Sequence, residues 1–225
     1  MEYGKLDILK NQIIDGKGKR NTKEFLEILI KKFAKKTESL FDITGELIYY
    51  YREQQLHSIF VPVIDEIADA IITEMPVDRN NSNYGWVDYW IKYGSTIFLI
   101  ELKHSYFNIT SNKFRDSSKK EWETAIKQIK SLNKVNYLKT NNENIIKIAL
   151  NVITLYKSSN SKTKLDIYKI YEKINNMKLE KLHKQTYQPD FISYWIPPKK
   201  MADLNIEWED GKEVYPAVMF IAKIL

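Results

Sequence analysis

The chain has 225 residues, of which 44% are hydrophobic, and it has no cysteine. That length accommodates one packed domain, and the lack of cysteine excludes disulfides, thiolate metal sites and cysteine nucleophiles, which suits a reducing cytoplasm. The net charge of +6 comes mostly from lysine and favours a phosphate backbone as partner, although a lysine-rich solvated surface explains it equally well.

The N-terminal residues lack an apolar stretch flanked by basic residues, so no secretory signal is expected. The longest apolar runs, such as 97–100 and 217–222, are too short to cross a bilayer. We therefore expect no membrane partner and a cytoplasmic location.

Residues 1–20 are polar and are expected to be peripheral. A helix is predicted over 21–36, with Asn21 as its cap and Glu24 three residues later. A second helix is predicted from Asp42 or Thr44 to about residue 61, with helical character continuing to about 69 beyond a break or new turn at Pro62.

The remaining pattern alternates strands and helices. Strands are predicted at 70–75, 86–93, 96–105, 145–156, 191–196 and 214–224, and helices at 118–132 and 165–181. The helix at 118–132 carries an apolar stripe made of Trp122, Ala125, Ile126, Ile129 and Leu132. We expect an α/β fold in one domain over residues 1–225, with a mixed central β-sheet flanked by helices.

The tripeptide Glu101-Leu102-Lys103 is the first candidate for chemistry. An acidic residue two positions before a lysine also occurs at 15–17 and 210–212, but there glycine stands between them in a loop-like context. Glu101-Leu102-Lys103 instead ends the apolar run 97–100, and in a strand Glu101 and Lys103 point to the same face.

The residues before this strand predict a hairpin. Gly94-Ser95 suits a two-residue type II′ turn, because glycine stands at the first central position. Tyr93 then faces Thr96, and counting back along both strands sets Asp88 directly opposite Glu101. Directly opposed residues have Cβ atoms roughly 5 Å apart on one face.

In the same register Trp86 lies opposite Lys103. Two carboxylates so placed repel each other unless a cation lies between them, and Mg²⁺ accepts carboxylate oxygens while keeping water for a phosphate ligand. Lys103 can then contact a scissile phosphate or hold the attacking water. The alternative is an exposed hairpin with an ordinary acid–lysine pairing, and a slip of one residue would put Asp88 and Glu101 on opposite faces.

Asp88, a hairpin and Glu101-Leu102-Lys103 together resemble the PD-(D/E)xK, or restriction-endonuclease-like, nuclease superfamily. Trp86-Val87 precede Asp88 in place of the proline that names the motif. The resemblance covers residues 46–156 in the element order α-β-β-β-α-β. It implies a nuclease core over about 44–156 and a C-terminal α/β elaboration over 157–225.

The resemblance also implies residue roles. Asp88 and Glu101 would bind Mg²⁺, for which Mn²⁺ can substitute, the Leu102 carbonyl often joins them, and Lys103 is the catalytic lysine. The expected function is a metal-dependent endonuclease, a phosphodiesterase acting on DNA and leaving 5′-phosphate ends. A role in restriction or antiphage defence would suit such a protein by analogy.

A further glutamate often comes from the preceding helix in such proteins. Glu53 is the choice here, expected in mid-helix on the face shared with Tyr50 and Leu56. Glu46 and Glu66 are rivals, and an exposed glutamate without a role at the site is an equal alternative for Glu53.

The segment after the tripeptide mixes aromatic and basic residues, which could follow a nucleic-acid backbone and stack bases, although a polar loop is an equal alternative. Its candidate nucleic-acid contacts are Lys113, Arg115, Lys119 and Lys120, interleaved with Tyr106, Phe107 and Phe114. Gln128 resembles a glutamine that some of these nucleases place beside the lysine. His104 is expected to be structural.

Two other functions remain open. A non-catalytic module that binds nucleic acid or a protein partner could keep the fold, and a nuclease could act on RNA or on branched junctions. The sequence also leaves open whether the protein is a homodimer.

Overall fold

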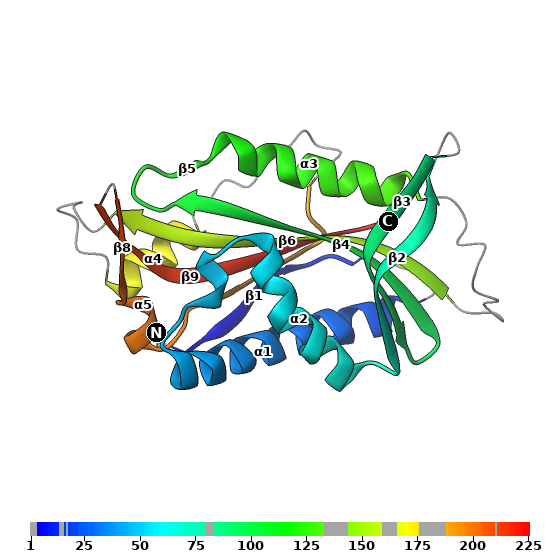
Figure 1. The fold of residues 1–225 in the computed structure, drawn as a ribbon, viewed down its shortest axis with the longest axis horizontal. Coiled ribbons are helices and arrows are strands. Elements are labelled where there is room, and N and C mark those ends of the chain that lie inside the picture. The colour runs from blue at the N-terminus through cyan, green and yellow to red at the C-terminus, as the bar shows by residue number, and fades with distance from the viewer. Residues whose placement is uncertain are drawn as a thin grey trace.

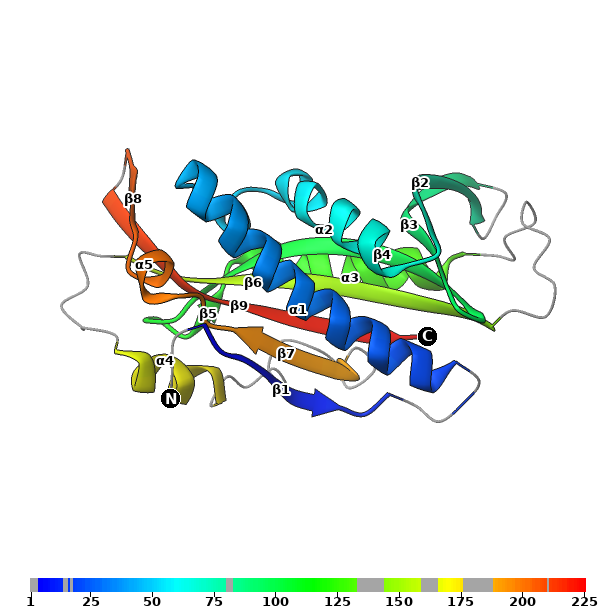
Figure 2. The same ribbon diagram turned by 90° about the horizontal axis from the view of Figure 1, so that it is seen from below.

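The computed structural model describes residues 4–13, 16, 18–79, 83–132, 144–158, 166–175, 188–209 and 211–225. In these residues, helices lie against both faces of one mixed sheet of nine strands (Figures 1 and 2). The strands are β1 (Leu6–Asn11), β2 (Ala70–Arg79), β3 (Asn83–Tyr93), β4 (Thr96–Asn108), β5 (Lys113–Phe114), β6 (Asn144–Ser158), β7 (Phe191–Trp195), β8 (Asn205–Trp208) and β9 (Gly211–Ile224). The helices are α1 (Lys19–Thr44), the 3-10 helix η1 (Ile48–Tyr50), α2 (Glu53–Ile67), α3 (Asp116–Lys130), α4 (Ile167–Asn175) and α5 (Lys199–Ala202).

The strand order across the sheet is β1-β7-β9-β6-β4-β3-β2, with β5 paired to β4 and β8 paired to β9. Strands β4 and β6 are parallel, whereas the other pairs are antiparallel. Apart from the two-residue strand β5 between β4 and α3, the order α2, β2, β3, β4, α3, β6 agrees with the order expected from the sequence. The long apolar run of β6 is explained by its central place, where both faces of the sheet are covered.

Two hydrophobic cores fill the space between the sheet and the helices. Residues of α1 and α2 pack on one face, and residues of α3 and α4 pack on the other. The predicted stripe is confirmed within α3, where Trp122, Ala125, Ile126 and Ile129 are buried, and Leu132, also buried, lies just beyond the end of the helix. In the described part of the chain, no helix is long and apolar enough to cross a membrane.

The N-terminal helices differ from the prediction. Helix α1 begins after Gly18 and continues to Thr44, where Gly45 with φ of +75° ends it in the left-handed conformation. The predicted helix start at residue 42 or 44 is therefore wrong. Asn21 does not cap α1; its side-chain amide instead donates to Thr96 Oγ1 at 3.0 Å. Pro62 lies within α2 and does not end it.

Three short strands were missed. Residues 1–20 were expected to be peripheral, but β1 pairs with β7 at the edge of the sheet. Strands β5 and β8 form hairpin-like pairs with β4 and β9. The predicted helix at 165–181 is confirmed over α4 alone, because residues 176–187 lie outside the described residues.

Candidate active site

The β3–β4 hairpin has the predicted turn. Gly94 has a φ of +55°, and Ser95 is not among the residues with positive φ, as a type II′ turn requires. Tyr93 pairs with Thr96, and the predicted register continues to the pair Tyr89 and Ile100. The hairpin register is therefore confirmed over those five pairs.

Backbone pairing between β3 and β4 ends at Tyr89 and Ile100, so the predicted pair of Asp88 directly opposite Glu101 does not form. Beyond this point β3 stays with β2, and Trp86 pairs with Pro76 of β2. The predicted position of Trp86 opposite Lys103 is wrong, and its indole is 60% exposed. The strand leaves β4 where β2 is also irregular, because Glu74 is unpaired there and has a φ of +49°.

Asp88 still reaches β4 through its side chain. Its Oδ2 accepts the backbone N–H of Leu102 at 2.7 Å. The carboxylate thus takes a backbone donor that continued pairing with β3 would have used. Asp88 also lies close enough to Glu101 for its charge to raise the pKa of Glu101.

Glu101 is buried, with 2% of its surface exposed. Its Oε1 lies 3.5 Å from Lys103 Nζ, and its Oε2 lies 3.7 Å from Arg79 Nη2 but has no hydrogen-bond partner. Burial and the charge of Asp88 raise the pKa of Glu101 to about 7, although Lys103 and Arg79 act in the opposite direction. Glu101 is therefore a buried carboxyl group with two ion pairs and one oxygen, Oε2, that accepts no hydrogen bond.

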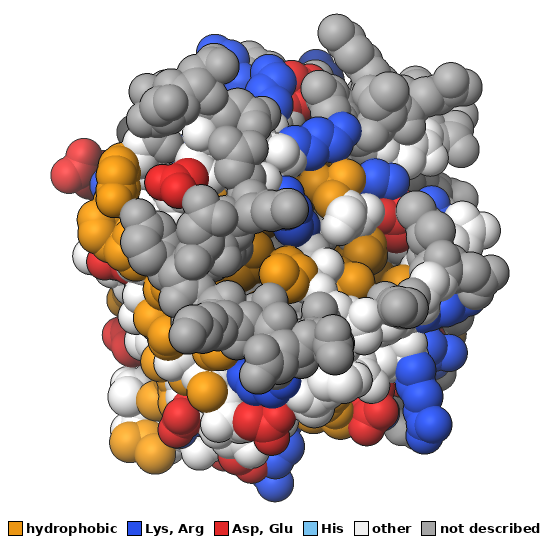
Figure 3. All heavy atoms as spheres, turned by 90° about the vertical axis from the view of Figure 1, so that its right-hand side faces the viewer, with side chains coloured by type: hydrophobic (Ala, Val, Ile, Leu, Met, Phe, Trp, Pro, Cys, Tyr) orange, Lys and Arg blue, Asp and Glu red, His pale blue; other side chains and the backbone are white. Residues whose placement is uncertain are grey.

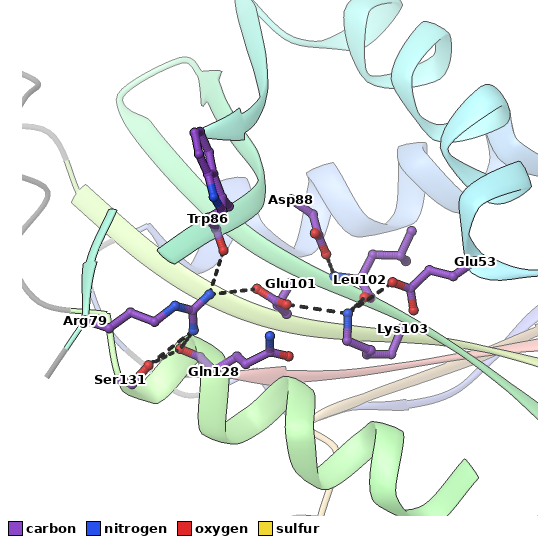
Figure 4. A network of polar contacts seen from close by, with 9 residues as sticks. All are labelled: Glu53, Arg79, Trp86, Asp88, Glu101, Leu102, Lys103, Gln128 and Ser131. Atoms are coloured by element: carbon purple, nitrogen blue, oxygen red, sulfur yellow. Dashed lines mark hydrogen bonds and ion pairs between the residues drawn. The ribbon is translucent and has the colours of Figure 1, made fainter. Parts of the chain in front are cut away.

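Lys103 is held by oxygen atoms from two elements (Figure 4). Its Nζ donates to Glu53 Oε1 at 3.1 Å and to the Leu102 carbonyl at 2.8 Å, in addition to the ion pair with Glu101. Burial alone would lower the pKa of Lys103, but the charges of Glu53, Asp88 and Glu101 raise it overall. Lys103 is therefore a charged ammonium at neutral pH.

Of the three candidate helical acids, Glu53 is the one in contact with Lys103. Glu46 instead accepts a hydrogen bond from Tyr51 Oη at 2.9 Å, and Glu66 pairs with Lys32 on the surface. The expected mid-helix position of Glu53 is wrong, because Glu53 is the first residue of α2. Its contact with Lys103 comes from the N-terminal end of the helix rather than from a helical face.

Arg79 was not predicted to be at the site. It is the last residue of β2, and its guanidinium donates to the carbonyls of Trp86 at 2.6 Å and of Gln128 at 2.8 Å. The side chain crosses Gly85, where an added Cβ would lie 2.1 Å from Arg79 Nε. The sequence signal was the arginine itself, in a chain whose positive charge is mostly lysine, together with a glycine inside the next strand.

These side chains line an open pocket of about 580 Å³. Its lining consists of Arg79, Gly85, Trp86, Asp88, Glu101, Lys103, Lys127, Gln128 and Ser131. Gln128 Oε1 is buried without a hydrogen-bond partner. Among the described residues, no group of three or more His, Asp or Glu side chains is spaced to hold a metal ion.

The predicted nucleic-acid contacts do not all lie at this pocket. Lys113 and Lys120 are exposed, and the Arg115 guanidinium stacks between the rings of Tyr106 and Tyr156. The side chain of Lys119 lies outside what the structure describes. Phe107 and Phe114 pack against each other, with Phe107 buried, so these two rings are not presented for base stacking.

His104 is structural, as predicted. It is buried, its Nε2 lies 2.8 Å from Thr154 Oγ1, and burial lowers its pKa to about 4. At the end of the molecule that carries the β2–β3 hairpin, Lys and Arg side chains are interspersed with acidic and hydrophobic ones (Figure 3). The mild basicity of the chain is therefore not concentrated on the described part of that face.

No family model, no curated protein and no solved structure matches this chain. The interpretation of the site depends on its geometry and chemistry.

Proposed function

We propose that the chain is a metal-dependent endonuclease that hydrolyses phosphodiester bonds, with DNA as its substrate. The observation that carries this proposal is the convergence of Asp88, Glu101 and Lys103, from two strands, on one open pocket. The element order α2, β2, β3, β4, α3, β6 further supports the resemblance to the PD-(D/E)xK nucleases.

The residues at the pocket fit a divalent cation. Glu101 Oε2 is buried and lacks a hydrogen-bond partner. Of the two oxygens of Asp88, Oδ2 is the one that accepts the Leu102 N–H. Two coupled carboxylates gain from a cation between them, and hard oxygen donors select Mg²⁺ or Mn²⁺. The Leu102 carbonyl could add a third donor once Lys103 Nζ, which now occupies it, turns toward substrate.

When bound, the cation would supply Lewis-acid polarisation of the phosphate and of the attacking water. Lys103 would donate to a phosphate oxygen and offset the charge that develops in the transition state. Glu53 would keep Lys103 charged and oriented. Gln128 Oε1, which lacks a partner, could accept a hydrogen bond from the water and align it.

The test is nicking of supercoiled DNA by purified protein with Mg²⁺ or Mn²⁺. Asp88→Ala and Lys103→Ala should remove the activity, because each takes away a group that no neighbour can replace. Asp65→Asn and Lys35→Ala are matched controls at exposed positions on α2 and α1, and they should cut normally. Equal activity in Asp88→Ala would show that the cleavage arises elsewhere.

A non-catalytic binding module is the second candidate. The observation that favours it is that Lys103 already has three oxygen partners, so the cluster could serve only to fasten α2 to β4. Calorimetry with Mg²⁺ or Mn²⁺ separates the two functions. Binding that Glu101→Ala removes supports the nuclease, whereas no binding to wild type supports the module. Parallel assays on RNA and junction substrates test the substrate class.

A further inference from the structure

A second and larger cleft, of about 950 Å³, lies beside the candidate active site. Its walls come from η1, the start of α2, β4 and the β8–β9 hairpin. The lining residues are Tyr50, Tyr51, Arg52, Gln54, Gln55, Tyr106, Arg115, Ser158, Trp208, Glu209, Gly211, Lys212, Glu213 and Tyr215. This volume is at the upper end of what small ligands occupy, so it suits one or two nucleotides rather than a duplex.

Aromatic rings form one wall of the cleft. Tyr50 stacks on Tyr51, with ring centroids 4.2 Å apart, and on Tyr215 at 5.2 Å. The Trp208 ring meets Tyr50 edge-on at 5.8 Å, and Trp208 is 48% exposed although its Nε1 donates to Tyr215 Oη. A half-exposed indole held in place by rings and a hydrogen bond is a preformed stacking surface.

Positive charge stands beside these rings. The Arg115 guanidinium lies 4.6 Å from the Tyr106 ring centroid and 4.7 Å from that of Tyr156, which fixes its orientation. Glu213 is 4.0 Å from Arg115 and accepts a hydrogen bond from Tyr215 Oη. Arg52 is exposed, and none of the described carboxylates lies within ion-pair distance of it.

The cleft and the candidate active site share two elements. Arg52 and Gln54 flank Glu53, which contacts Lys103. Tyr106 follows Lys103 by three residues on β4, which is roughly 10 Å along the strand, and the two side chains leave opposite faces of the strand. Tyr106 Oη also lies within hydrogen-bond distance of the carbonyls of Tyr50 and Tyr51, at 2.9 and 2.7 Å, and so connects the aromatic wall to β4.

We propose that this cleft binds an unpaired nucleotide segment of the strand that is cut, with bases stacked on Trp208 and the Tyr50–Tyr51 pair and phosphates at Arg52 and Arg115. The identity of the ligand rests on the proposed nuclease function. A strand whose phosphate lies at Lys103 would enter the cleft within a few nucleotides. The substrate class is thus DNA that carries a single-stranded overhang, flap or junction arm.

The test is binding of fluorescein-labelled (dT)12 in EDTA, measured by anisotropy, so that no cleavage is needed. Wild type should bind (dT)12 and a duplex with a (dT)12 overhang more tightly than a blunt duplex. Trp208→Ala and Arg115→Gln should each weaken binding of the single strand by roughly tenfold. Trp208→Phe should restore most of the affinity. Tyr168→Ala, an aromatic on α4 that is 64% exposed, is the matched control and should bind normally.

Equal affinity of wild type for (dT)12 and blunt duplex, or an unchanged affinity in both cleft variants with native circular dichroism, would overturn the proposal. Free thymidine monophosphate that binds as tightly as (dT)12 would also overturn it, because the cleft would then take a nucleotide and not a strand. Arg115→Gln, at a half-exposed position, keeps the test valid if Trp208→Ala fails to fold. Cleft-dependent binding without any nuclease activity would refute the proposed function alone.

Discussion

The Asp88 carboxylate accepts the backbone N–H of Leu102 at 2.7 Å, at the point where β3 stops pairing with β4. One oxygen of Asp88 thus satisfies a backbone N–H at the edge of β4, while the negative charge of the same carboxylate raises the pKa of Glu101. The fold and the candidate chemistry depend on different properties of Asp88, namely a hydrogen-bond acceptor and a negative charge. Substitutions can separate them.

Asp88→Asn keeps an acceptor for Leu102 N–H and removes the charge. Its free energy of unfolding should stay within about 0.5 kcal/mol of wild type, whereas Asp88→Ala should lose roughly 1 kcal/mol or more because a donor is left unpaired. Both variants should lose binding of Mn²⁺. Urea denaturation and calorimetry measure the two effects, and an Asn variant as unstable as the Ala variant would contradict the role of the hydrogen bond.

Binding of a divalent cation should release protons near neutral pH. Because burial and the charge of Asp88 raise the pKa of Glu101 to about 7, part of the protein carries a proton on Glu101 at neutral pH, and a cation must displace that proton. The number of protons released should approach zero at pH 9, where Glu101 is already ionised. Titration of Mn²⁺ in two buffers with different ionisation enthalpies measures it. Glu101→Gln should show neither proton release nor tight binding, and release that does not change with pH would point to another group.

The metal-free protein should show opposing pH effects on stability. The unfolded chain loses the Glu101 proton near 4.5 and the folded chain near 7, so this group makes folding less favourable as pH rises through that window. His104 does the reverse, because its pKa is about 4 when folded and 6.5 in its ordinary state. Each effect amounts to roughly 3 kcal/mol at most.

In Glu101→Gln the Glu101 contribution is gone, so the pH dependence of stability should follow the His104 contribution. In EDTA the stability of this variant should rise more steeply between pH 4.5 and 7 than that of wild type, and at pH 8 it should exceed wild type. Thermal melts across this range measure the difference. Parallel profiles for the two proteins would mean that burial does not raise the pKa of Glu101.

The parts of the site that follow from local rules could be predicted from the sequence. Gly94 sets the turn, and the turn sets the register that brings Asp88 near Glu101. The departure of β3 from β4 could not be predicted, because it depends on the pairing of β3 with β2. Arg79 was missed for the same reason, since it reaches Glu101 only by crossing a strand that is adjacent in space.

The N-terminal region shows the same limit. The six residues of β1 carry little periodicity, and their partner β7 lies about 180 residues away in the sequence. Glu53 was chosen on the assumption of a continuous helix, yet its position depends on the end of α1 at Gly45 and a new start after Arg52. The contact with Lys103 was expected, but the local structure that produces it was not.

A substitution at Gly85 should change stability and metal binding only by displacing the Arg79 side chain. A Cβ at Gly85 would lie 2.1 Å from Arg79 Nε, so Gly85→Ala should displace the guanidinium from the carbonyls of Trp86 and Gln128. Loss of these bonds should cost roughly 1–3 kcal/mol of unfolding free energy, as in Arg79→Ala. Gly16→Ala, where no atom lies within 4 Å of an added Cβ, is the matched control.

A double-mutant cycle decides whether the two residues act as one unit. If they do, adding Gly85→Ala to Arg79→Ala should change stability by less than about 0.5 kcal/mol. Both single variants should also shift the pH midpoint of Mn²⁺ binding upward, because Arg79 lowers the pKa of Glu101 and its loss makes the proton a stronger competitor. Additive losses of stability, or a shift in the Arg79 variant without one in the Gly85 variant, would show that Gly85 has a role separate from Arg79.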